Sequence, residues 1–161
     1  PGRGAGEAPA RGRLWWGARG GGAFAAAVTN DAAGPARAIH GRAPSGPQTA
    51  IGSRSHGSEA TQDYLKAYDV ADFVAAGSSL KFCLLAEGKA DIYPRMGRTM
   101  EWDTAAGDAV LRAAGGRVET LDGQPLRYGK RFDSGDGAYA NPHFVAFGMT
   151  KTAPRSASIS E

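Results

Sequence analysis

The stretch E-W-D-T-A-A-G at residues 101–107 is the most informative part of the chain, and a helical pattern ended by a Gly-Gly pair follows it. It places the aromatic Trp102, the carboxylate of Asp103 and several small residues where a helix should begin. A carboxylate at a helix start accepts backbone N–H bonds and stays ionised. We therefore predict a helix over residues 103–114. The open carboxylate at its start suits either a simple helix cap or a metal and phosphate site.

Strand and helix patterns alternate on both sides of this helix. Two apolar segments, residues 14–16 and 23–28, flank a Gly-rich turn and predict a β-hairpin. Further strands are expected at residues 49–53, 70–74, 90–93, 117–121 and 144–147, and further helices at 58–68 and 79–87. Residues 30–48 are predicted as loop, and Pro94 is expected to close the strand before it. This alternation predicts an α/β fold.

Composition favours a globular protein and excludes several classes. The chain has 161 residues, of which 42% are hydrophobic, so it can bury a core of about one domain. Its apolar runs are too short to span a bilayer, which takes about 20 residues. The single cysteine, Cys83, excludes an internal disulfide and a cysteine-based zinc site, and its helical spacing predicts a core position. The net charge of +3 is weak.

The two ends differ in composition from the rest of the chain. Residues 1–13 are rich in Gly, Pro and Arg, and residues 149–161 are polar, so we predict that both lack regular structure. Residues 14–148 then form the folded part. The Arg-Gly-Gly run at residues 19–21 also occurs in nucleic-acid-binding segments, but a single copy between two apolar strands argues against that function. No nucleic-acid partner is expected.

Two strand-to-helix junctions carry side chains that suit a phosphate. Residues 53–56 read S-R-S-H, so that either Arg54 or His56 could reach phosphate oxygens and either Ser53 or Ser55 could donate to them. Residues 77–81 read G-S-S-L-K and end in Lys81. Backbone N–H groups and the helix dipole favour an anion at such junctions. Each junction is equally explained by a capped loop, with Lys81 facing solvent.

Taken together, these motifs resemble the inositol monophosphatase superfamily of lithium-sensitive, magnesium-dependent phosphatases. Residues 102–107 are similar to its second signature, W-D-x-A-A-G, and residues 14–24 resemble its hairpin. Residues 53–56, 77–83 and 87–93 look closest to the CysQ branch, the 3′(2′),5′-bisphosphate nucleotidases. The resemblance spans residues 14–148 and implies a layered α/β sandwich of the inositol monophosphatase type.

The chain departs from this family in one respect. The first signature, D-P-[ILM]-D-G-[ST], and the upstream glutamate that supplies a metal ligand do not occur in it. The chain begins at Pro1 instead of a methionine. We therefore expect the C-terminal part of a longer enzyme, which is inactive by itself because the first metal motif is missing.

The resemblance implies a reaction and a set of residues. The expected enzyme, linked to sulfur assimilation, hydrolyses adenosine 3′,5′-bisphosphate to AMP and phosphate with a water that Mg²⁺ activates. Asp103 would be a metal ligand close to the substrate. The other substrate-binding residues would be Ser53, His56, Gly77 and Lys81, with Lys81 on a phosphate.

Two other functions stay open beside this one. The chain also suits an inositol monophosphatase-type phosphatase or a non-catalytic fragment that binds a nucleotide or phosphate. The partner expected in the first case is a small nucleotide bisphosphate. The resemblance implies a cytoplasmic protein, and peripheral association with the inner membrane is an alternative.

Overall fold

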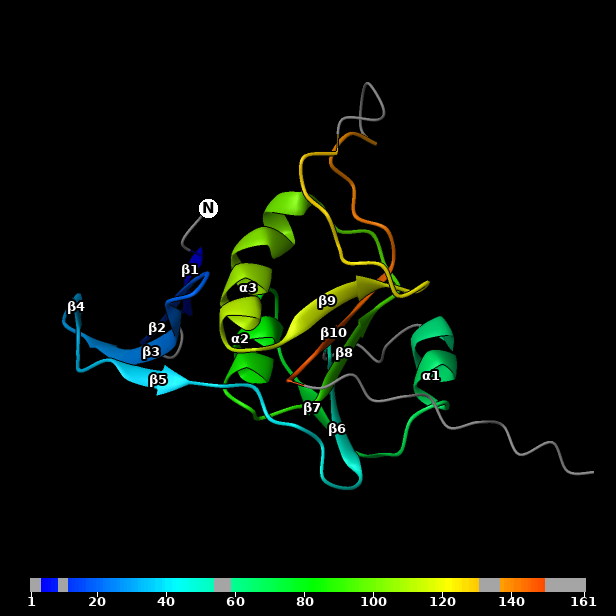
Figure 1. Cartoon of the computed structure of the whole chain (residues 1–161), viewed down its shortest axis with the longest axis horizontal. Coiled ribbons are helices and arrows are strands. Elements are labelled where there is room, and N and C mark those ends of the chain that lie inside the picture. The colour runs from blue at the N-terminus through cyan, green and yellow to red at the C-terminus, as the bar shows by residue number, and fades with distance from the viewer. Residues whose placement is uncertain (1–3, 9–11, 54–58, 131–136, 150–161) are drawn as a thin grey trace, which may run out of the picture.

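The computed structural model describes residues 4–8, 12–53, 59–130 and 137–149, and it arranges them in layers (Figure 1). The first layer is an antiparallel sheet of β1 (Gly4–Ala8), β2 (Arg13–Ala18), β3 (Gly22–Thr29), β4 (Ala32–Ala33) and β5 (Arg37–Ile39). The second sheet holds β6 (Gln48–Gly52), β7 (Val70–Ala75), β8 (Ile92–Arg95), β9 (Arg117–Thr120) and β10 (Phe144–Phe147). The predicted layered α/β sandwich is therefore confirmed.

Three helices cover the second sheet. Helices α2 (Leu80–Ala86) and α3 (Glu101–Ala113) lie between the two sheets, and α1 (Glu59–Leu65) lies on the opposite face (Figure 1). The second sheet has the order β7-β6-β8-β10-β9, in which β7, β6 and β8 are parallel and the remaining pairs are antiparallel. Among the described residues, no helix is long and apolar enough to cross a membrane.

The first sheet shows where local patterns misled the sequence prediction. The predicted hairpin is confirmed, with Trp15 opposite Ala25. The prediction that residues 1–13 lack regular structure is wrong for Gly4–Ala8, which pairs with β2. Residues 30–48, expected as loop, contain β4 and β5, and both pair with β3. In both segments, pairing with β2 or β3 satisfies the main-chain hydrogen bonds. A Gly- or Pro-rich composition gives no sign of this pairing.

Strand β10 of the second sheet is apolar throughout because both of its faces are covered. On β10, Phe144 and Ala146 belong to the core shared with α2 and α3, whereas Val145 and Phe147 belong to a second cluster on the side of α1. Successive residues of a strand point to opposite faces, so a strand covered on both sides reads as a continuous apolar run. Pro94 does not close β8 as expected, because it lies inside the strand opposite Val145.

The small residues of the opening signature have a packing role. A Cβ atom added at Gly107 would lie 2.6 Å from Cδ2 of Phe82, so α3 approaches α2 as closely as a glycine permits. The helix begins at Glu101, two residues before the predicted start. Its first turn lies at the edge of the second sheet and carries Asp103 there.

Buried carboxylates tie the layers together. Glu87, just after α2, accepts the indole N–H of Trp15 at 2.8 Å and forms an ion pair with Arg13 at 3.0 Å, both residues coming from β2. Asp91 forms a two-pronged pair with Arg42, at 2.7 and 2.6 Å, and accepts the backbone N–H of Thr49 at 2.7 Å. These contacts fix the first sheet and its linker on the helix layer and the second sheet.

Candidate active site

The parallel strands of the second sheet end together at one edge, where the chain switches faces. After β6 the chain passes through α1 to β7, and after β7 it passes through α2 on the other face to β8. Ligands of open α/β sheets bind outside the carboxyl ends of strands at such a switch point. A cavity of about 220 Å³ lies there. It is lined by Ser53, Ser78, Lys81, Phe82, Tyr93, Arg95, Arg98, Thr99, Asp103 and Thr104.

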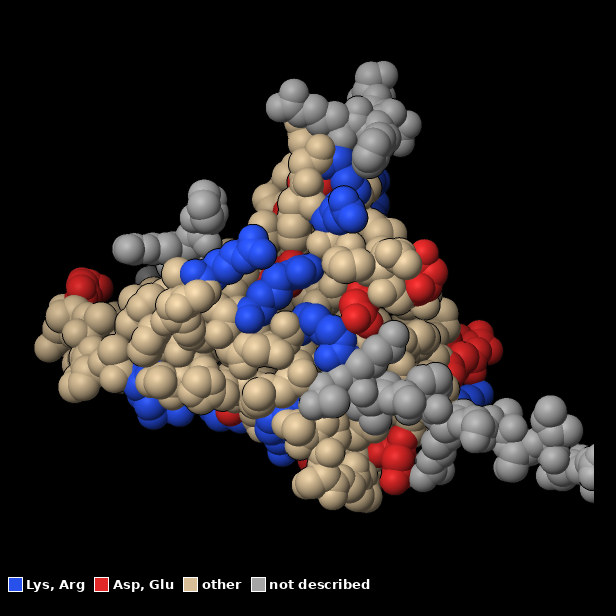
Figure 2. All heavy atoms as spheres, in the orientation of Figure 1, with Lys and Arg blue, Asp and Glu red and all other residues tan. Residues whose placement is uncertain are grey.

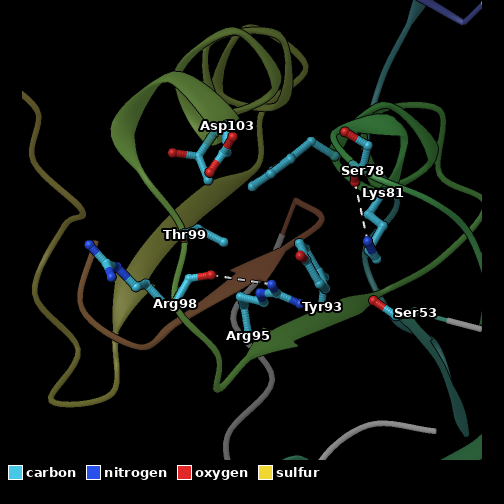
Figure 3. Close-up of a pocket in the computed structure, with 10 residues that line it drawn as sticks. Ser53, Ser78, Lys81, Tyr93, Arg95, Arg98, Thr99 and Asp103 are labelled. Carbon is cyan, nitrogen blue, oxygen red and sulfur yellow. Dashed lines mark hydrogen bonds between the residues drawn. The ribbon is translucent and has the colours of Figure 1, made fainter. Parts of the chain in front are cut away.

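The structure brings together three of the five site residues expected from the sequence. Ser53, Lys81 and Asp103 line this cavity from three different elements, and Figure 3 shows them around a common open centre. Gly77 does not line it, although the neighbouring Ser78 does. His56 lies outside the described residues, so its proposed contact stays a prediction.

Asp103 is the third residue of α3 instead of the first. Its side chain is exposed, and Oδ2 accepts the backbone N–H of Met100 at 2.8 Å. An acid at this third position reaches back to the residue before the helix and stabilises the helix start. The prediction that Asp103 is the N-cap is wrong in position, because the N-cap is Met100, but the Asp103 carboxylate does stabilise the helix start through its bond to the Met100 N–H. The same carboxylate makes the cap contact and lines the cavity wall.

Lys81 is buried beside the cavity, with only 3% of its surface exposed. Its ammonium donates to the carbonyl of Ser78 at 3.2 Å and lies 5.2 Å from the ring centroid of Tyr93. Burial, and then the charge of Arg95, lower the pKa of Lys81. The alternative of a solvent-facing lysine is wrong. An anion bound between the charged groups of Lys81 and Arg95 would stabilise both cations.

Sequence reasoning missed the two arginines of the site. Arg95 ends β8, Arg98 lies in the turn before α3, and an Nη of Arg95 donates to the carbonyl of Arg98 at 3.4 Å (Figure 3). The available signal was a basic residue at the carboxyl end of a parallel strand, where ligand-binding side chains gather. With Lys81, these arginines give the cavity three cations beside one carboxylate.

A second set of polar contacts fixes the start of α3. The side-chain amide nitrogen of Asn141 lies 2.9 Å from the Met100 carbonyl and 3.0 Å from the hydroxyl oxygen of Thr104. Glu101 accepts the backbone N–H groups of Gly129 and Lys130 at 2.8 and 2.9 Å. These contacts hold the backbone that carries Asp103, which keeps its carboxylate at a fixed place on the cavity wall.

The described residues do not by themselves fit a magnesium ion. Mg²⁺ takes octahedral oxygen ligands, usually one or two carboxylates with waters and substrate phosphate oxygens. The cavity wall supplies Asp103 as its carboxylate, next to three cations. Within the described ranges, no group of three or more His, Cys, Asp or Glu side chains is placed to hold a metal. The arrangement fits a phosphate group and supplies at most one carboxylate ligand of a metal site.

Cys83 and the charged surface do not point to other chemistry. Cys83 is buried, and burial together with nearby Glu87 raises the pKa of its thiol to about 12, which suits a core residue. On the face shown in Figure 2, Lys and Arg gather over the upper and central part, whereas Asp and Glu lie mostly toward the right side. The absence of a nucleic-acid partner stays a prediction.

Comparison with known proteins shows the family of the chain. Residues 3–154 match the inositol monophosphatase family. The chain belongs to this family. Among solved structures of the family, it resembles CysQ from Bacteroides thetaiotaomicron at 33% identity and a TM-score of 0.77, over 92% of this chain and 58% of that one. The inositol monophosphatase of Anabaena shares the fold, at 23% identity and a TM-score of 0.59, over 85% of this chain and 50% of that one.

Curated relatives cover shorter parts of the chain. It is 54% identical over 76 residues to the 3′(2′),5′-bisphosphate nucleotidase CysQ of Buchnera aphidicola, and 45% identical over 98 residues to the protein of that name in Escherichia coli K12. These matches cover 47% and 61% of this chain, but only 29% and 38% of the two relatives. A protein encoded in the pss 5′ region of Rhizobium leguminosarum is 71% identical over 75 residues, which are 47% of this chain and 79% of that protein.

Proposed function

We propose that this chain is the C-terminal, substrate-binding part of a 3′(2′),5′-bisphosphate nucleotidase that converts adenosine 3′,5′-bisphosphate to AMP and phosphate. The observation that carries the proposal is the cavity at the strand ends, where buried Lys81 and half-buried Arg95 lie with Asp103. The similarity to CysQ nucleotidases supports the choice of substrate. A second phosphate on the substrate also suits a cavity with several cations.

The residues of the chain take separate roles in this proposal. Lys81 and Arg95 bind a phosphate through charge-assisted hydrogen bonds, and Ser53 and Ser78 donate from their hydroxyl groups. Asp103 would contribute one ligand to Mg²⁺, and a bound ion would supply the chemistry of lowering the pKa of a water and stabilising negative charge on oxygen. Further carboxylates are required for that ion, so we propose that the chain alone is inactive. His56 and Gly77 are retained as proposed substrate contacts.

The test is magnesium-dependent phosphate release by the complete gene product that contains this chain. We expect release from adenosine 3′,5′-bisphosphate with Mg²⁺, none with EDTA, and little from inositol 1-phosphate. Faster release from inositol 1-phosphate would assign the protein to the inositol monophosphatases instead. Absence of release from either compound would reject a phosphatase of this class.

The scarcity of carboxylates favours a second candidate for the chain taken alone, a non-catalytic binder of nucleotide or phosphate. Titration calorimetry of the 161-residue chain with AMP and with the bisphosphate measures binding, which both candidates expect. Phosphate release by the complete gene product separates them, since binding by the chain with no release by the complete gene product supports a non-catalytic binder. The expected site of action is the cytoplasm, and cell fractionation checks this against the alternative of peripheral inner-membrane association.

A further inference from the structure

One short segment of the chain, residues 98–104, supplies much of the wall of the cavity that contains Lys81. It joins β8 to the first turn of α3. Its side chains Arg98, Thr99 and Asp103 lie around the open centre in Figure 3, and Thr104 lines the same cavity. Connecting segments are more mobile than the elements that they join. The wall therefore keeps its shape only where contacts from elsewhere in the chain hold this segment.

Asn141 holds the segment from behind the wall. It lies in the loop before β10, it is only 8% exposed, and it does not line the cavity. Its side-chain amide nitrogen lies 3.2 Å from Oγ1 of Thr99, 2.9 Å from the Met100 carbonyl and 3.0 Å from Oγ1 of Thr104. Its backbone N–H also donates to the Thr99 carbonyl at 2.8 Å. A single residue from a distant part of the chain thus contacts three members of the segment.

The hydroxyl group of Thr104 is committed to the same network. Its oxygen accepts the amide N–H of Asn141 at 3.0 Å and the hydroxyl of Tyr128 at 3.3 Å. It donates in turn to the Glu101 carbonyl at 3.3 Å. These three contacts already use the one hydrogen and the two lone pairs of a hydroxyl. Although Thr104 lines the cavity, its hydroxyl therefore serves the wall itself and is not free for a phosphate.

The other end of the Asn141 amide is bonded as well. The Lys130 ammonium donates to its carbonyl oxygen at 3.2 Å and forms an ion pair with Glu101, in the first turn of α3, at 2.8 Å. The network thus starts and ends on the segment that it holds. A buried network whose members are all hydrogen-bonded is rigid, whereas removal of one member leaves buried polar groups unpaired.

We propose that Asn141, acting through Thr104, is a positioning residue that holds residues 98–104 in the geometry that binds the substrate phosphate. The inference rests on the proposed function and assigns part of the affinity to a residue that does not touch the ligand. Breaking the network would let Arg98 and Asp103 move with the segment, and a displacement of about 1 Å is enough to weaken a contact severely. Asn141 and Thr104 are buried inside the described part of the chain, so the proposal does not depend on what else completes the site.

The test is a double-mutant cycle on the complete gene product, with binding measured in EDTA to prevent turnover. Calorimetry gives the Kd of adenosine 3′,5′-bisphosphate for wild type, Asn141→Leu, Thr104→Val and the double variant. Both substitutions keep the size and the charge of the side chain and remove its hydrogen bonds. We expect each to weaken binding about tenfold. The double variant should also lose about tenfold and not about a hundredfold, because both changes remove the same support.

Two controls separate positioning from loss of stability. Thr104→Ser restores the hydroxyl and should bind the nucleotide within about twofold of wild type. Val145→Ala removes buried methyl groups on the side of β10 that faces α1, away from the cavity. It should lower the melting temperature and leave the Kd unchanged. If Asn141→Leu does not fold, the same cycle is run with Tyr128→Phe, which removes the other donor to Thr104.

Three outcomes would overturn the inference and leave the nucleotidase function standing. The first is a Kd within about twofold of wild type for Asn141→Leu and Thr104→Val. The second is an additive loss, near a hundredfold in the double variant, which would mean that Thr104 contacts the ligand itself. The third is an equal loss of affinity in Val145→Ala, which would assign the effect to stability alone. If wild type binds no nucleotide at millimolar concentration, the proposed substrate is rejected and the inference is rejected with it.

Discussion

Carboxylates have two different roles in this molecule. Glu87 and Asp91, at the junction of the layers, have side chains that are 1% exposed and are surrounded by donors from the chain itself. Asp103, at the edge of the second sheet, is exposed, and its Oδ2 accepts the N–H of Met100. The first two carboxylates hold the fold together. The third faces a cavity that also contains cations.

The contrast shows how a structural acid differs from a binding acid. A buried carboxylate must find its hydrogen bonds within the protein, because taking an ionised group out of water without replacing its water contacts costs several kcal/mol even after the protein relaxes. The N–H of Trp15 and the charges of Arg13 and Lys89 meet this need for Glu87. An exposed carboxylate that only caps a helix keeps acceptor capacity for a ligand. Substitutions at the two places should therefore separate stability from function.

The largest effect is expected at Asp103. In the complete enzyme, Asp103→Asn should lower phosphate release about 1000-fold, equivalent to about 4 kcal/mol, because an amide is a much poorer metal ligand. The melting temperature should change by no more than about 3 °C, since Asn can still accept the Met100 N–H. A malachite-green phosphate assay and thermal denaturation give the two numbers.

The matched control for that substitution is Asp63→Asn, which alters an exposed carboxylate paired with Lys66 on the surface. It should leave phosphate release unchanged. A loss of melting temperature at Asp103→Asn as large as its loss of activity would mean that the residue is structural, and the distinction drawn above would fail.

The next largest effect is expected at Glu87, where stability and not function should change. Glu87→Ala should lower the free energy of unfolding by about 3 kcal/mol, because Trp15, Arg13 and Lys89 lose a shared buried partner. The affinity for adenosine 3′,5′-bisphosphate should stay the same, since Glu87 does not line the cavity. Urea denaturation and calorimetry measure the two quantities.

A surface pair provides the comparison for Glu87. Asp63→Ala breaks the exposed pair with Lys66, and exposed pairs contribute about 0–1 kcal/mol. If Glu87→Ala and Asp63→Ala lowered the free energy of unfolding equally, burial would not determine how much these carboxylates contribute to stability.

The sequence predicts those features of the fold and the site that local spacing determines, and it misses those that depend on contacts between distant parts of the chain. The signature at residues 101–107 indicated both the fold and Asp103, because Gly107 is required by packing and Asp103 by its place in the first turn. The junctions that carry Ser53 and Lys81 could be placed at one sheet edge, because the carboxyl ends of parallel strands gather there. Local spacing was sufficient for these residues.

Other features depended on contacts between distant parts of the chain. Arg95 and Arg98 follow no periodic pattern, and only the pairing of β8 with β6 and β10 places them at the cavity. Pro94 concealed the true end of that strand, because proline usually marks a strand boundary. Strand β1 was missed because its glycines favour turns, whereas its structure comes from pairing with β2.

A moderate effect on binding is expected at Lys81. Lys81→Met keeps the apolar stem and removes the charge, so affinity for the nucleotide should fall about tenfold, or about 1.4 kcal/mol. Stability should not fall, since a buried cation is costly when no carboxylate of the described residues forms an ion pair with it. Calorimetry measures the Kd, and Lys66→Met, on the surface, is the control. Unchanged affinity would remove Lys81 from the site and leave Arg95 and Arg98 as the anion-binding groups.

The smallest effect concerns pH. Burial alone would raise the pKa of Glu87, but the hydrogen bonds from Lys89 and Trp15, with the charges of Lys89 and Arg13, lower it below its ordinary value of 4.5. A carboxylate with a lowered pKa stabilises the folded state above its unfolded-state pKa, and that contribution is lost as the pH falls below about 4.5. Urea denaturation at several pH values should therefore show a steeper loss of stability below pH 4.5 for wild type than for Glu87→Gln, which carries no ionisable group there. Parallel curves would mean that Glu87 titrates alike in the folded and unfolded chains. Its neighbours would then compensate only for its burial.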